Sequence, residues 1–167
     1  MKTVSTVALI LLSIVAIIYF IYDYNSFTFK ADIDDVAFKG DRGGAHYESH
    51  VLQIAAVHDA PETLKVVIVL NASKVGTYLL NDDPPRTGNV AMYGIGGTVF
   101  ASTNGFTGST TITKLDLEEK KLSGTFAFRA VQVSPQGSKV VNVTNGVFED
   151  IPIRYIGTTT SHDSDTR

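Results

Sequence analysis

From Phe27 onward, apolar and polar side chains alternate in short segments, and this period of two constrains the fold most. In residues 27–33, "FTFKADI", the odd-numbered positions are apolar and the even-numbered positions are polar. Such alternation predicts a half-buried strand. Residues 63–71, "TLKVVIVLN", are apolar at nearly every position and predict a central strand that is covered on both faces. In "LSGTFAFRA" the alternation places Phe126 and Phe128 toward the core.

Turn-forming residues separate about nine or ten segments of this kind, at spacings typical of all-β folds. We therefore predict an all-β domain over residues 27–155, a single antiparallel β-sandwich or flattened barrel. Residues 46–58 are predicted to form one bent strand, and Asn145-Gly146 to form a turn before the last strand. Residues 156–167 lack an apolar pattern and predict a disordered polar tail.

The N-terminal segment predicts a membrane anchor. Residues 4–22 carry no charged side chain, and a helix of about 20 such residues spans a bilayer. Lys2 precedes the segment and Asp23 follows it, so the positive-inside rule places residues 1–3 in the cytoplasm and the bulk of the chain in the periplasm. Residues 23–26 form a short linker. We predict a single-pass protein of the inner membrane, with the lipid bilayer as the partner of residues 4–22.

Two other interpretations of this segment remain open. A secretory signal is cleaved after small residues, whereas this apolar run ends in the bulky sequence "IYFIYDYNSF". The aromatic residues are instead typical of the membrane interface, which favours an uncleaved signal-anchor. A buried helix of a soluble domain is the third interpretation.

Charge and cysteine content exclude several classes of function. The net charge is −3, and apart from Lys120-Lys121 the Lys and Arg residues are scattered singly, so the sequence lacks the basic stripe that nucleic-acid binding needs. There is no cysteine, which excludes disulfides, thiolate metal sites, a cysteine nucleophile and a lipid anchor through cysteine.

The segment "AHYESH" contains the only candidate metal triad, His46, Glu48 and His50. Side chains at alternating positions share one face of a strand, and His58 would join them on an unbroken strand. Two imidazoles and a carboxylate suit Zn²⁺ or Fe²⁺. Residues four apart on a strand, however, lie about 13 Å apart, too far to bind one ion without a bend. We predict a solvated strand end with no catalytic, cofactor-binding or metal-binding residue.

Two further motifs have structural interpretations. The acidic "DIDD" of residues 32–35 lacks the Gly and Glu that an EF-hand needs at later positions, and predicts a turn. "GIGG", residues 94–97, is followed by the strand-like "TVFAST", whereas a phosphate-binding loop opens a helix. No G-x-S-x-G nucleophile motif is present.

Three segments near the C-terminus carry a family resemblance: "TITK" at 111–114, "SGTFAFRA" at 123–130 and "TNGVFEDIP" at 144–152. Over residues 109–153 they resemble an uncharacterised family of small envelope β-domains, often lipoproteins, from bacteria of the Bacteroidota type. The resemblance implies a compartment and a β-fold, and it implies no catalytic residues. Many members carry a lipobox cysteine, which this chain lacks, and this favours the transmembrane anchor.

These observations predict a non-enzymatic module of the bacterial cell envelope that binds a protein partner or serves as an accessory subunit of a membrane assembly. A binder of a small apolar ligand or a glycan, held in a barrel-like cavity, is the first alternative. A metal-dependent enzyme that uses His46, Glu48 and His50 is the second.

Overall fold

The computed structural model describes residues 27–59, 63–80, 88–103, 105, 107–133 and 139–157. This part of the chain contains eleven strands and no helix, which confirms the all-β prediction. The strands are β1 (Thr28–Ile33), β2 (Val36–Lys39), β3 (Arg42–Glu48), β4 (Val51–His58), β5 (Leu64–Asn71), β6 (Gly76–Leu80), β7 (Val90–Ile95), β8 (Thr98–Ala101), β9 (Gly108–Asp116), β10 (Lys121–Gln132) and β11 (Val140–Gly157).

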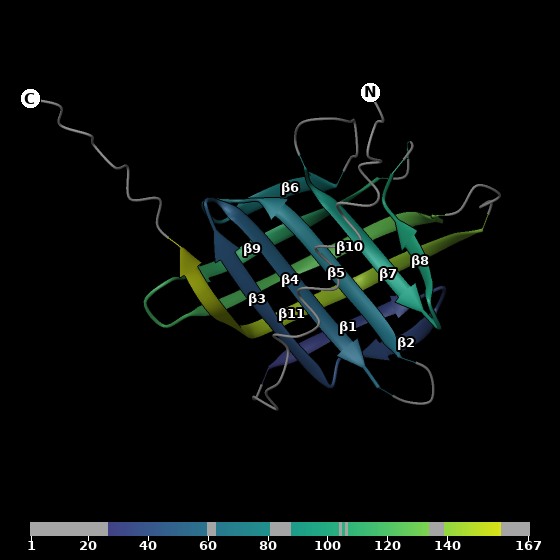
Figure 1. Ribbon diagram of the computed structural model, residues 1–167, viewed down its shortest axis with the longest axis horizontal. Helices are drawn as coiled ribbons and strands as arrows, with labels where there is room; N and C mark the ends of the chain where they lie inside the picture. Colours follow the sequence, from purple (N-terminus) through teal and green to yellow (C-terminus); the bar gives the residue numbers. More distant parts are fainter. Residues whose placement is uncertain are drawn as a thin grey trace, which may run out of the picture.

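The strands form two packed layers that share one hydrogen-bonded network. The first layer has the order β2-β1-β11-β10-β9-β6, and the second layer has the order β3-β4-β5-β7-β8. Strands of the second layer run across β9, β10 and β11 (Figure 1). The long strands β10 and β11 join the layers, because β10 continues from β9 to β8 and β11 continues from β1 to β3. The fold is therefore a sandwich with hydrogen-bonded corners.

The prediction of a wholly antiparallel fold is wrong at one pairing. The C-terminal end of β11 runs parallel to β3, with Ile153 opposite Ala45 and Ile156 opposite Tyr47. This pairing arises because β11 extends beyond its last partner on β10, where Pro152 lies opposite Lys121. β11 also continues to Gly157, two residues past the predicted end of the domain.

Phenylalanines of the first layer fill the centre of the core, and three of them lie opposite a glycine of a neighbouring strand. Cross-strand pairs join Phe128 to Gly108, Phe126 to Gly146 and Phe148 to Gly124. A Cβ atom added to Gly146 would lie 2.6 Å from Cδ2 of the Phe126 ring, and one added to Gly124 would lie 2.6 Å from Cζ of the Phe148 ring, so these two rings occupy space that a side chain would need. The glycines of the segments 123–130 and 144–152 therefore make room for the phenylalanine rings of the same two segments.

Two predicted boundaries between strands are wrong. Residues 46–58 form a hairpin, because Ser49 and His50 both adopt positive φ angles, 50° and 67°, and make a two-residue turn between β3 and β4. Asn145, with φ of 51°, forms no turn. It lies inside β11, where the register with β10 shifts between Phe126 and Phe128, so the chain makes a bulge and the strand continues.

Within the described ranges, the structure contains no helix that is long and apolar enough to cross a membrane. The predicted transmembrane segment 4–22, its flanks 1–3 and 23–26, and tail residues 158–167 lie outside the described residues.

Candidate functional site

The second layer is apolar on its outer face as well as on its inner face. Inward-facing side chains of β5, such as Val66, Ile68 and Leu70, belong to the main core. Outward-facing side chains of β4, β5, β7 and β8 form a second cluster, which we call the outer cluster, and their exposed fractions lie between 2 and 8%. Its buried members are Ala55, Val57, Val67, Val90, Met92 and Ala101. The middle of β5 is therefore covered on both faces, as the sequence predicts, while Lys65 and Val69 on its outer face are only half-buried.

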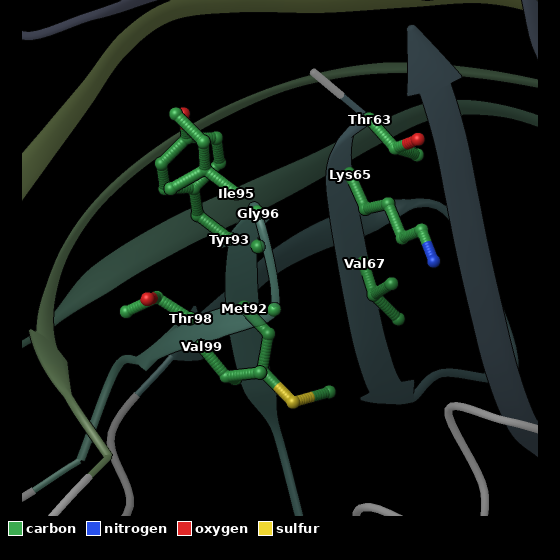
Figure 2. A pocket seen from close by; sticks show the side chains of 11 residues that line it. Thr63, Lys65, Val67, Met92, Tyr93, Ile95, Gly96, Thr98 and Val99 are labelled. Atoms are coloured by element: carbon green, nitrogen blue, oxygen red, sulfur yellow. The ribbon is translucent and has the colours of Figure 1, made fainter. Parts of the chain in front are cut away.

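A groove lies beside the outer cluster, between β5 and the hairpin that joins β7 to β8 (Figure 2). Its volume is about 360 Å³. Lys65 and Val67 line it from β5, Met92 lines it from β7 and Val99 from β8. An apolar groove with one cationic side chain can hold a small molecule or a polypeptide side chain.

Glycines shape the far end of this groove. Gly96 and Gly97 have φ angles of 53° and 84° and form the turn of the β7–β8 hairpin. The first half of "GIGG" therefore ends β7 and the second half turns into β8, so the segment leads into a strand, as the sequence predicts, and does not open a helix. Sequence reasoning found the glycines but missed the groove, because the groove also needs β5 beside β7, and local patterns do not report which strands pair.

The three residues of the candidate triad lie at the β3–β4 turn, and their side chains do not meet at one point. His46 and Glu48 share the outer face of β3, with Nε2 of His46 3.5 Å from Oε2 of Glu48. His50 lies in the turn, and its Nδ1 atom is 3.4 Å from the hydroxyl of Tyr47. Among the described residues, no group of three or more His, Asp or Glu side chains is placed to hold a metal ion.

We expect the purified protein to retain no stoichiometric zinc or iron after dialysis. The physical reason is that a metal site needs three ligands within about 2.3 Å of one point, which these side chains do not offer. Elemental analysis of the full chain and of a His46→Ala/His50→Ala double variant checks this expectation. Stoichiometric metal in the parent chain, lost in a folded double variant, contradicts it.

His58 and its neighbours form an ionic group at the opposite end of the β3–β4 hairpin. Arg42 donates two hydrogen bonds to the carboxylate of Asp59, at 2.7 and 2.6 Å. Nδ1 of His58 lies 2.7 Å from Oδ2 of Asp41, but the contact is poorly directed for a hydrogen bond. This group fastens the start of β3 to the end of β4.

The hydrogen bonds from Arg42 lower the pKa of Asp59 from its ordinary value of 3.8, and burial opposes them. The positive charges of Arg42, His58 and Lys65 lower this pKa further. A lowered pKa means that the folded state favours the carboxylate form. The interaction therefore stabilises the fold above pH 3.8 and is lost as the pH falls through the lowered pKa.

We expect Asp59→Asn to lower the free energy of unfolding by at most about 1 kcal/mol at pH 7, because the pair is exposed to solvent. The difference from the parent should shrink as the pH falls below 3.8 and should vanish once the pH has passed the lowered pKa of Asp59, where the carboxylate of the folded parent is protonated. Urea unfolding of both chains at several pH values measures this. A difference that stays constant down to pH 2 contradicts it.

The acidic segment of residues 32–35 forms a turn, as the sequence predicts. Asp34 and Asp35 have φ angles of 47° and 66° and connect β1 to β2. Oδ1 of Asp34 accepts hydrogen bonds from the backbone N–H and side-chain amide of Asn142, and Oδ2 of Asp32 accepts one from Asn145. These carboxylates tie the β1–β2 hairpin to β11.

The fold and these surface features define the chain as a two-layer all-β domain. A family model described as a domain of unknown function (DUF6252) matches residues 25–152. The chain belongs to this family, which confirms the predicted membership of an uncharacterised domain family. An origin in the Bacteroidota stays a prediction. The searches matched no curated protein and no solved structure.

Proposed function

We propose that this protein is a membrane-anchored, extracytoplasmic binding or accessory-subunit module of the bacterial cell envelope, and that it is not an enzyme. The edge strand β6 is the observation that carries the binding role. β6 ends the strand order of the first layer, and within the described residues its only partner is β9. Val75 and Leu79 are 53 and 61% exposed beside this edge.

The backbone of β6 supports pairing with an added strand. The carbonyl oxygen of Leu79 accepts a hydrogen bond from the amide of Asn89, so it points away from β9. Alternate residues of an antiparallel strand direct their backbone groups to the same side, so the N–H and C=O of Thr77 also face the open edge. Partner strands add to such edges through backbone hydrogen bonds, and flanking apolar side chains supply specificity.

The uncharged segment 4–22 supports the anchor, since its length matches the bilayer core. Alkaline phosphatase fused to the C-terminus tests the topology, because it is active only outside the cytoplasm. We expect an active fusion, and Lys2 retained on the purified protein. An inactive fusion contradicts the topology, and a mature N-terminus near Phe27 contradicts the anchor.

Affinity purification from mild detergent, with mass spectrometry of the bound proteins, tests the binding role. We expect a protein that the parent chain captures and that Thr77→Pro loses, because proline removes the free N–H of the edge while edge strands tolerate it. Val36→Lys is the matched control, since Val36 is 69% exposed but lies at the other edge of the layer. Equal capture by the parent and a folded Thr77→Pro variant contradicts the proposal.

A second candidate function is the binding of a small apolar ligand, and the groove in Figure 2 favours it. The sequence interpretation placed such a ligand in an interior cavity. The groove instead lies on the outer face of the second layer, while the rings of Phe29, Phe126 and Phe148 fill the interior.

A further inference from the structure

The groove beside the outer cluster has a lining that fits one chemical class of ligand. Its apolar surface comes from Val67, Met92 and Val99, and Val67 and Met92 also belong to the outer cluster. Figure 2 shows the side chains of Lys65 and Val67 on one side of the groove, with Met92 and Val99 opposite them. The groove therefore has an apolar floor and one cationic wall.

The space exists because one row of the sheet lacks a central side chain. Gly94 lies between Lys65 on β5 and Val99 on β8. A Cβ atom added to Gly94 would meet only the carbonyl oxygen of Thr98 at 3.7 Å and Cβ of Lys65 at 3.9 Å. Both are ordinary van der Waals distances, so the fold does not require glycine here for lack of room. A side chain at Gly94 would instead occupy the groove.

Lys65 supplies a positive charge that no described residue neutralises. It is half-buried, and within the described part of the chain its ammonium group forms no hydrogen bond or ion pair. Asp59, whose pKa Lys65 influences, already accepts two hydrogen bonds from Arg42. An ammonium group without a close partner gains from an anionic ligand, because charge-assisted hydrogen bonds are stronger than neutral ones.

We propose that this groove binds a single-chain aliphatic carboxylate, with its carboxylate on Lys65 and its chain against Val67, Met92 and Val99. This inference rests on the second candidate function, ligand binding, and names its site and ligand class. Burial of the chain against apolar surface drives binding, and the ion pair selects the anion. A neutral ligand of the same length keeps the contribution of apolar burial and loses the contribution of the ion pair.

The methionines give a direct readout, because the chain contains only Met1 and Met92. The probe is octanoate, titrated into the full chain in lipid nanodiscs with methyl-labelled methionine, and octanol is its neutral counterpart. We expect octanoate to shift the Met92 signal saturably and to bind about tenfold more tightly than octanol, the gain typical of a charge-assisted hydrogen bond. The ratio between two ligands is compared across variants in the same nanodiscs, so partition into the bilayer cancels.

Three variants separate the contribution of the Lys65 charge to ligand binding from that of the space beside Gly94. Lys65→Met should abolish the preference for octanoate and keep weak binding of both ligands. Gly94→Val should abolish both titrations by filling the groove. Lys39→Met, which removes an exposed cation from β2, should behave as the parent chain. The backbone amide spectrum of each variant confirms that it is folded.

The outcomes distinguish the ligand class from the function on which it rests. An octanoate-to-octanol ratio that is the same in the parent chain and in Lys65→Met overturns the assignment of an anionic ligand and leaves ligand binding standing. Absence of any saturable Met92 shift with either ligand overturns both the carboxylate site and the ligand-binding function. Binding unchanged in a folded Gly94→Val variant places the ligand elsewhere and overturns the site.

Discussion

Replacing Phe126 by alanine is expected to lower the free energy of unfolding by about 3 to 5 kcal/mol, the usual cost of removing a buried phenylalanine side chain. Phe126 is 4% exposed and lies among three other rings. Its ring centroid is 5.1 Å from that of Phe29, and 6.2 Å from those of Phe128 and Phe148. These rings come from β1, β10 and β11, so the cavity would weaken the contact of all three strands.

A loss of this size is a large part of the stability of a typical domain, which is about 5 to 15 kcal/mol. Urea unfolding of the full chain in detergent, followed by circular dichroism, measures the change. Thr125→Ala is the matched control, because Thr125 is the preceding residue and faces solvent. We expect a change within about 0.5 kcal/mol for it. A loss below 1 kcal/mol for Phe126→Ala would mean that β10 buries its other face.

The inward direction of Phe126 and Phe128 was predictable because a strand with one buried face must alternate along its whole length. The same rule would also have predicted the β3–β4 turn from the sequence. Buried apolar positions are odd-numbered at Ala45 and Tyr47 and even-numbered at Leu52 and Ile54, so the phase changes at Ser49-His50. A single strand cannot change phase without a bulge or turn. The turn lacks the glycine or asparagine that usually marks one.

Asn145 shows the opposite case. Its positive φ is what the dipeptide Asn-Gly predicts, but a bulge uses that conformation as readily as a turn. Which of the two forms depends on the partners of β11, since β10 and β1 pair with it on both sides of Asn145. Long-range pairing decides the outcome.

The candidate sites also divide into features that local alternation predicts and features that depend on long-range strand pairing. The solvated positions of His46 and Glu48 follow from local alternation, and the structure places both on one face of β3. The groove depends on Lys65 lying opposite Gly94, and the edge depends on β6 pairing with β9. Both are contacts between strands separated along the chain, which the period of the sequence does not encode.

Gly124→Ala is expected to destabilise the protein by about 3 kcal/mol, the upper part of the range for overpacking a core. A Cβ atom at Gly124 would overlap the carbonyl oxygen of Thr111 and would lie 2.6 Å from Cζ of the Phe148 ring. The Thr111 carbonyl belongs to β9 and cannot rotate away as a side chain can. The Phe148 ring is fully buried against Phe29 and Phe126, so it has no free space to enter.

Gly94→Ala is the matched control for Gly124→Ala, since it makes the same chemical change inside another strand. Its Cβ atom would have no contact closer than 3.7 Å, so we expect a change within about 1 kcal/mol, with either sign. Parallel urea unfolding of both variants isolates the effect of space, because the loss of backbone freedom in the unfolded chain is the same for both. If the two variants had equal stability, the glycines of residues 123–130 and 144–152 would not be needed to make room for the phenylalanine rings. A large difference instead means that these glycines and rings together specify how the first layer packs.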